Sequence, residues 1–169
     1  MGTRRLTLLR HGKAEALDAY PEDYERPLTH RGSIDAEKMA KHLVNGNLVP
    51  DLILVSPAER AWATAEIIAS TCELDAKQVQ CARELYLGTP ERTWRLLAQR
   101  PASLHHILIC GHNPGLSELA SRFGPKPRRR ELSTAAIATA VWRHAEWATM
   151  QPESADECEL EEPDDLDDL

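Results

Sequence analysis

Short apolar runs recur along this chain, and each gives way to a polar cluster or a turn. An uninterrupted apolar run is typical of a strand covered on both faces of a sheet, whereas alternation marks a half-exposed strand. The runs predict strands at Leu6–Leu9, Asp51–Val55, Val79–Ala82 and His106–Cys110. Ala136–Trp142 alternates weakly and predicts a late strand, with Glu146–Met150 as its candidate hairpin partner.

Segments with helical spacing separate these strands. One helix is predicted to start after Thr29, a good capping residue, and to run to about Asn45. A second follows Ser56, with proline in its first turn and a glutamate that completes a capping box, and runs to about Cys72. Further helices are predicted at Thr89–Arg100 and Leu116–Phe123.

The alternation of strands and helices predicts an α/β fold. We expect a three-layer α/β/α arrangement with a mostly parallel central sheet, right-handed crossovers and helices on both faces. In such sheets the carboxyl ends of the strands form the ligand-binding edge. Three polar clusters follow strands at that edge: Arg10-His11, Ser56 with Arg60, and Gly111-His112. The sequence therefore predicts a polar site where these clusters meet.

The composition is that of an ordinary globular domain, but the charge is unevenly distributed. Hydrophobic residues make up 42% and charged residues 28% of the 169 residues. Residues 153–169 hold ten of the 27 acidic residues and no lysine or arginine, so the rest of the chain is mildly basic despite a formal net charge of −7. We expect one domain at residues 1–152 and a disordered acidic tail at residues 153–169. A mildly basic domain suits an anionic ligand.

Other function classes find little support in the sequence. No apolar run approaches the ~20 residues that span a bilayer, and the N-terminal run is too short for a signal peptide, so a cytoplasmic location is expected. The four cysteines form no Cys-x-x-Cys pair. His105 and His106 are adjacent and would face opposite sides of a strand, which disfavours a shared metal ion. The basic run from Lys126 to Arg130 is expected to be a solvated loop rather than a nucleic-acid site.

The predicted site has the residue types that bind and transfer a phosphoryl group. An arginine matches phosphate oxygens with two donors at once, and Arg10 and Arg60 are placed to do so. His11, mostly neutral at pH 7, can supply a nitrogen nucleophile, while His112 can donate a hydrogen bond to the phosphoryl oxygens. Gly12 lets a ligand approach the backbone closely. The arginines and His112 supply positive charge, so neither a metal nor another cofactor is expected.

Three motifs in order resemble those of the histidine phosphatase superfamily, the phosphoglycerate mutase-like enzymes. Alone, Leu9-Arg10-His11-Gly12 fits a histidine that ends a buried strand better than it fits a catalytic motif. Val55–Ala65 and Cys110–Pro114 are similar to the second and last motifs of the family. The resemblance covers roughly residues 4 to 142, and three motifs in register are far more specific than one.

The resemblance implies roles for particular residues. The family forms a phosphohistidine on the histidine of its first motif, here His11, and uses a second catalytic histidine, here His112. The arginine of the second motif, Arg60, would bind phosphate. Ser56 and Asn113 stand within the second and last motifs and are further candidates for substrate binding.

Within the superfamily, the short chain and the sequence Arg26-Pro27-Leu28-Thr29-x-x-Gly32 most resemble the SixA-type phosphohistidine phosphatases. In that group this arginine lines the pocket, which makes Arg26 a further anion ligand. The long insertions of the sugar-phosphate mutases are absent, so an open, shallow site is expected. A shallow site admits a phosphohistidine that stands out from the surface of another protein.

The sequence defines the proton donor for the leaving group less well. The superfamily usually places a glutamate on the loop after its middle strand, and Glu84 occupies a comparable place. Glu15 and Asp18, near the first motif, are rival candidates. A phosphoramidate bond is weak once its nitrogen is protonated, so that substrate has less need of a dedicated acid.

These observations predict a metal-independent phosphatase that hydrolyses phosphohistidine on a partner protein through a covalent intermediate on His11. Two alternatives stay open: a phosphomonoesterase of the same superfamily that acts on a small molecule, and a phosphoprotein-binding module without turnover. The presence of both His11 and His112 favours an enzyme over the binding module. Neither a nucleic acid nor a membrane is an expected partner.

Overall fold

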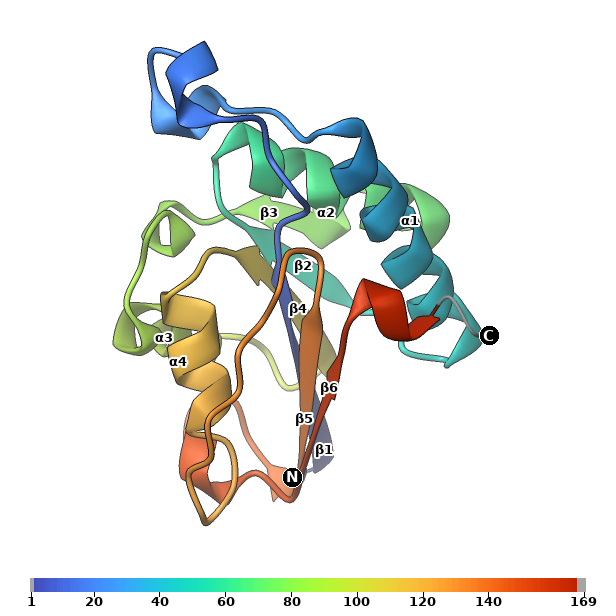
Figure 1. Ribbon diagram of the computed structural model, residues 1–169. Coiled ribbons are helices and arrows are strands. Elements are labelled where there is room, and N and C mark those ends of the chain that lie inside the picture. Colours follow the sequence, from blue (N-terminus) through green and yellow to red (C-terminus); the bar gives the residue numbers. More distant parts are fainter. Residues whose placement is uncertain (1, 167–169) are drawn as a thin grey trace.

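The computed structural model describes residues 2–166, which form a six-stranded sheet between two layers of helices (Figure 1). The strands are β1 (Gly2–Arg10), β2 (Leu52–Val55), β3 (Val79–Cys81), β4 (His106–Gly111), β5 (Ile137–Ala145) and β6 (Glu157–Glu161). The helices are α1 (His30–Asn45), α2 (Glu59–Thr71), α3 (Pro90–Ala98) and α4 (Gly115–Ser121). The strand order is β3-β2-β4-β1-β5-β6, parallel from β3 to β1 and antiparallel beyond. The predicted α/β class is confirmed.

Two apolar cores, one on each face of the sheet, hold the layers together. The core under α1 and α2 includes Met39, Leu43 and Ile68, and the core under α3 and α4 includes Leu97, Leu119 and Phe123. Successive residues of β2 serve the two cores in turn, since Ile53 packs in the first and Leu54 in the second. Because both faces are covered, the strand is apolar throughout, as its sequence indicated.

Local capping signals fix the start of α1 and of α3 but not that of α2. The Thr29 hydroxyl caps α1 and the Thr89 hydroxyl caps α3, each by accepting a backbone N–H of the first turn. The capping box predicted at Ser56 is wrong, because α2 begins only at Glu59. The Ser56 hydroxyl accepts a hydrogen bond from the Ala58 N–H at 3.3 Å and lies 2.7 Å from a ring nitrogen of His112, so it does not cap the first turn of α2.

The C-terminal segment departs most from prediction. Glu157–Glu161 forms β6, which pairs with β5, and the 3₁₀ helix η6 (Pro163–Leu166) packs against α1. The expected disorder is therefore wrong for residues 153–166, and the domain extends beyond residue 152; residues 167–169 of the expected tail lie outside the described residues. Glu146–Met150, the candidate hairpin partner, forms a turn instead.

The physical reason is that β6 is an edge strand. It has one neighbour in the sheet, and its Glu157 and Glu159 are exposed to solvent. Charges on an edge strand discourage pairing with other chains. High charge with few apolar residues is also the composition of a disordered segment. Composition alone therefore could not distinguish an acidic edge strand from a disordered segment.

The register of the parallel strands brings the three polar clusters together. Arg10 at the end of β1 lies beside Gly111 at the end of β4, and Val55 at the end of β2 lies beside Cys110. The residues that follow these strands emerge at one edge of the sheet. Within residues 2–166, no helix is both long enough and apolar enough to cross a bilayer.

Candidate active site

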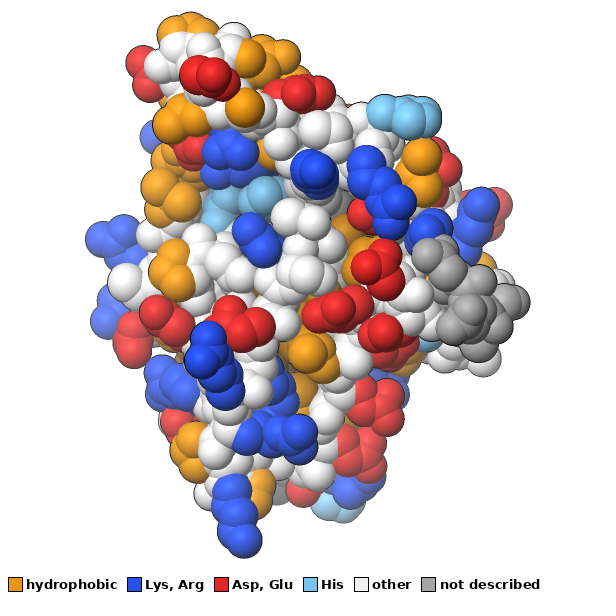
Figure 2. Space-filling model, in the orientation of Figure 1, with side chains coloured by type: hydrophobic (Ala, Val, Ile, Leu, Met, Phe, Trp, Pro, Cys, Tyr) orange, Lys and Arg blue, Asp and Glu red, His pale blue; other side chains and the backbone are white. Residues whose placement is uncertain are grey.

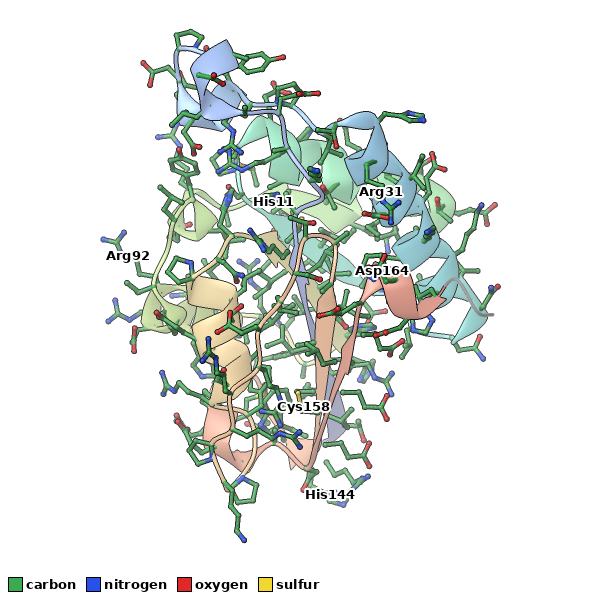
Figure 3. All side chains as sticks on the ribbon, viewed as in Figure 1. His11, Arg31, Arg92, His144, Cys158 and Asp164 are labelled. Carbon is green, nitrogen blue, oxygen red and sulfur yellow. The ribbon has the colours of Figure 1, made fainter. Side chains whose placement is uncertain are left out.

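The two histidines that were predicted to act together lie side by side at this edge. Their ring centroids are 5.2 Å apart and their planes are tilted by 56°. His11 follows β1 and His112 follows β4, and both rings are buried. Figure 3 places His11 where the chain leaves the sheet. In Figure 2, histidine atoms form the floor of a recess that is flanked by lysine and arginine side chains.

Hydrogen bonds define the protonation of the His11 ring. Its Nδ1 lies 2.7 Å from the Gly12 carbonyl oxygen, which can only accept, so Nδ1 carries the proton. Its Nε2 receives the Nε–H of Arg60 at 3.3 Å, and a guanidinium can only donate. Burial, followed by the charges of Arg60 and Arg10, lowers the pKa of His11 to about 4, although the bond to Gly12 acts the other way. At pH 7 the ring is therefore neutral, with a lone pair on Nε2.

His112 is held as the opposite tautomer. Its Nδ1 lies 3.4 Å from Nη2 of Arg60, again a donor, so Nε2 carries the proton and donates it to the Ser56 hydroxyl at 2.7 Å. Burial first, then the neighbouring His11 and Arg60, lowers the pKa of His112 to about 3. An anion bound between the rings would raise the pKa of His112, because a negative charge favours the imidazolium. Ser56, which was predicted to bind substrate, thus accepts a hydrogen bond from His112, a candidate catalytic residue.

The buried Arg60 connects both histidines to a carboxylate. One edge of its guanidinium, formed by Nε and Nη2, faces His11 and His112. Along the other edge, Nη1 donates to the backbone oxygen of Asp23 at 2.8 Å and Nη2 donates to its Oδ2 at 2.9 Å. Because Asp23 fixes one edge, the other is presented to the space between the imidazoles, where a phosphoryl group can accept two hydrogen bonds.

Asp23 also joins two further side chains of the site. Its Oδ1 accepts a hydrogen bond from Arg26 at 2.9 Å, and its Oδ2 accepts one from the Tyr86 hydroxyl at 2.7 Å. The Tyr86 ring stands edge-on to His112, with centroids 5.5 Å apart. Partial burial alone would raise the pKa of Asp23, but hydrogen bonds from Tyr86, Arg60 and Arg26 outweigh it and hold the pKa well below its usual range. Asp23 is therefore an anion in the free protein and has no proton to donate.

Asp23 and Tyr86 were missed in the sequence. Asp23 lies three residues before Arg26, in a polar loop that also contains Glu15 and Asp18, and no periodicity ranks one of these acids above another. Tyr86 lies two residues after Glu84, in the loop that was predicted to reach the site, and it is Tyr86 that contacts Asp23 and His112.

The three predicted acids are not drawn into the site. Glu84 is exposed and lines a separate hollow with Arg83. Glu15 and Asp18 are exposed as well, and only the backbone carbonyl of Glu15 takes part, by accepting a hydrogen bond from Arg26 at 2.7 Å. Among residues 2–166, none of these three carboxylates bonds to either histidine.

Arg10 and Asn113 meet at one backbone carbonyl. Nη1 of Arg10 donates to the Leu132 oxygen at 3.1 Å, and the Asn113 amide donates to the same oxygen at 2.8 Å. Asn113 also accepts from Ser117, so its side chain braces the start of α4. Nε of Arg10 is buried without an acceptor among the described residues. Burial, and after it the charge of Arg60, lowers the pKa of Arg10, so the two guanidinium groups share one neighbourhood.

Gly12 is required by a close backbone approach. A Cβ at this position would lie 2.7 Å from the carbonyl oxygen of Gly32 in α1. The Gly12 N–H donates to the Thr64 hydroxyl at 3.0 Å, and that hydroxyl donates to the Arg60 carbonyl at 2.7 Å. Gly12 thus ties the end of β1 to both α1 and α2, which places His11 and Arg60 relative to each other.

Comparison with known proteins finds a matching family model and similar solved structures. The model of the histidine phosphatase superfamily (branch 1) matches residues 6–118. The structure of the protein histidine phosphatase SixA complexed with tungstate is 25% identical to this chain, with a TM-score of 0.80 over 96% of this chain and 99% of that chain. SixA from Agrobacterium tumefaciens is 26% identical, with a TM-score of 0.70 over 81% and 91% of the two chains.

An uncharacterised protein of Picosynechococcus is 31% identical over 141 residues, which cover 78% of this chain and 81% of that protein. The matched part of the family model includes both histidines and Arg60. The chain therefore belongs to the histidine phosphatase superfamily, as a phosphatase of the SixA type.

Proposed function

We propose that this phosphatase hydrolyses phosphohistidine on a partner protein, by way of a phosphohistidine on its own His11. The observation that carries the proposal is the pair of neutral imidazoles that accept hydrogen bonds from the edge of Arg60 opposite to the edge bound by Asp23. A phosphoryl group that enters between the rings would replace these two hydrogen bonds, accept from the same guanidinium donors and meet the lone pair of His11 Nε2. The similarity to a SixA that binds tungstate, a tetrahedral oxyanion, supports a phosphoryl group in this space.

In the first step, Nε2 of His11 attacks phosphorus, and the bond between phosphorus and the substrate imidazole breaks. Arg60, Arg10 and Arg26 bind the equatorial oxygens and offset the charge of the transition state. The leaving imidazole takes a proton from solvent and departs neutral, so none of the acids Glu84, Glu15 or Asp18 is needed.

In the second step, water attacks phosphorus and the bond to Nε2 breaks, which returns the lone pair to His11. The product is dihydrogen phosphate, which releases a proton to solvent. The Nδ1 proton stays on the ring throughout, and its bond to the Gly12 carbonyl strengthens while the phosphorylated ring carries positive charge. His112 donates to a phosphoryl oxygen after its pKa has been raised by the bound anion.

The test compares kcat/KM on a phosphohistidine peptide and on phosphoserine, an alkyl phosphate ester whose leaving alkoxide needs a proton donor, with His11→Ala as the blank. We expect the phosphohistidine peptide to be preferred by roughly tenfold or more, because its leaving group needs no enzyme acid. Turnover of the ester without turnover of phosphohistidine would assign a small-molecule phosphomonoesterase instead. Tight phosphate binding with no turnover of either substrate would assign a binding module.

A further inference from the structure

A basic hollow adjoins the segment that carries Tyr86, and its lining residues take no part in the chemistry described above. It has a volume of about 590 Å³ and lies between the 3₁₀ helix η4 (Arg83–Leu85) and α3. Its charged lining residues are Arg83, Arg92, Arg95, Arg100 and Glu84, which leave an excess of positive charge. We call these four arginines the arginine shoulder.

The arginine shoulder differs from other arginine-bearing surfaces because most of its side chains have no acidic partner. On the rest of the surface, Arg122 and Arg143 each form ion pairs with glutamates. In the part of the chain that the structure describes, the guanidinium groups of Arg83, Arg92 and Arg95 form neither a hydrogen bond nor an ion pair. Their charge is therefore available to a group from outside the chain.

The arginine shoulder is firmly joined to the active site. Tyr86 directly follows η4, and its ring contacts His112. Beyond it, the backbone of Gly88 lies so close to Gly115 of α4 that a Cβ there would come within 2.2 Å of the Gly88 carbonyl oxygen. The chain between η4 and α3 is thus packed against the helix that follows His112. A molecule bound to the shoulder would be held at a fixed place relative to the two imidazoles.

Leu87 adds an exposed apolar residue in the segment that joins η4 to α3, the two elements that form the shoulder. Its side chain is 58% exposed, and its backbone has a φ of +51°. A leucine rarely adopts this left-handed conformation. A strained and exposed apolar residue beside an active site is typical of a surface that contacts a ligand.

We infer that the arginine shoulder, with Leu87 at its edge, is the docking surface for an acidic face of the protein whose phosphohistidine is hydrolysed; this inference rests on the proposed function. α3 presents Arg92 and Arg95 on the side opposite its buried Thr93 and Leu97, so both guanidinium groups face outward. Carboxylates of a partner would find unpaired donors there, which favours encounter and fixes orientation.

The charge distribution on the face shown in Figure 2 agrees with this assignment. Figure 3 shows Arg92 projecting at the left of the view, and Figure 2 shows lysine and arginine atoms along the same edge. Acidic atoms gather on the opposite side, where β6 contributes Glu157, Glu159 and Glu161. An acidic partner is thus attracted to the shoulder and repelled from the β6 side.

The test uses two phosphohistidine peptides of equal length, one with glutamates and one with lysines around the phosphohistidine, and free phosphohistidine as a third substrate. The variant is Arg92→Glu with Arg95→Glu. We expect its kcat/KM on the glutamate peptide to fall roughly tenfold at low ionic strength, with a smaller difference at high salt. Turnover of free phosphohistidine is expected to match the unaltered protein.

A matched control carries the same change of charge on a remote loop. Arg128 and Arg129 are exposed in the loop after α4, and Arg128→Glu with Arg129→Glu is expected to leave all three rates unchanged. A loss equal to that of the shoulder variant would show that net charge alone sets the rate. That result would overturn the docking surface.

Binding of the unphosphorylated peptides, measured by fluorescence anisotropy, separates this inference from the proposed function. We expect the unaltered protein to bind the glutamate peptide more tightly than the lysine peptide, and the shoulder variant to lose that preference. A preference without any hydrolysis of phosphohistidine would refute the proposed function and leave the docking surface intact. Equal binding of the two peptides by the unaltered protein would refute the docking surface.

Discussion

Arg60 is an example of one guanidinium whose two edges serve different partners. Asp23 accepts from one edge through its backbone and its carboxylate, which leaves the other edge to the space between His11 and His112. The histidines and Arg60 could be predicted from sequence because each follows the end of a buried strand. Asp23 could not, since it starts a short 3₁₀ helix (Asp23–Glu25) in a polar stretch where neither burial nor spacing marks it.

Replacement of Asp23 should weaken substrate binding more than it weakens the fold. Asp23→Ala removes the carboxylate oxygens that accept hydrogen bonds from Arg26 and from Nη2 of Arg60. Because hydrogen bonds between charged groups are strong, we expect KM to rise by roughly tenfold to a hundredfold. Asp23→Asn keeps the shape of the side chain and should fall between. Steady-state kinetics and thermal unfolding measure the two effects separately. An Asp23→Ala variant with an unchanged KM would show that Asp23 does not position the arginines.

Among the secondary-structure elements, the central strands β2 and β4 could be predicted from sequence, whereas the edge strand β6 could not. β2 and β4 are covered on both faces and carry uninterrupted apolar runs, so their sequences have one plausible interpretation. β6 has a partner on one side and a mostly charged sequence, and only the pairing of Val141 with Glu157 and its neighbours shows that it is a strand. The start of α2 was misplaced because a hydroxyl suited to capping was engaged by His112.

Removal of the chain from residue 156 onward should destabilise the domain. The deletion takes away β6, which pairs along β5, and η6, which packs on α1. We expect the melting temperature to fall by roughly 5 °C or more in differential scanning calorimetry, as for a loss of about 2 kcal/mol in a domain of this size. The control is Glu159→Gln, which removes an exposed charge but keeps the strand. A deletion variant with the same melting temperature as the full chain would show that β6 contributes nothing to stability.

Across the whole molecule, buried histidines couple stability to pH. His11, His112 and His106 are buried, and burial is the first cause that lowers the pKa of each, to about 4, 3 and 4. His106 lies in β4 and is bonded to the Thr7 hydroxyl at 2.8 Å. The folded protein keeps these rings neutral at a pH where the unfolded chain protonates them.

Stability should therefore fall as the pH is lowered from about 6.5 towards about 4. In this range the unfolded state binds more protons, so the free energy of unfolding decreases by about 1.4 kcal/mol per pH unit for each such histidine. Urea unfolding at a series of pH values measures the slope. His106→Gln, which can keep a bond to Thr7, should make the slope shallower. An identical slope in this variant would show that His106 is not buried as a neutral ring.

The central claim is that phosphorus becomes bonded to Nε2 of His11. Rapid quenching of the phosphatase during turnover of a ³²P-labelled phosphohistidine peptide, followed by proteolysis and mass spectrometry, tests it most directly. The expected result is an acid-labile label on His11 that is absent from His11→Ala. Label on any other residue, or full turnover by His11→Ala, would contradict the account.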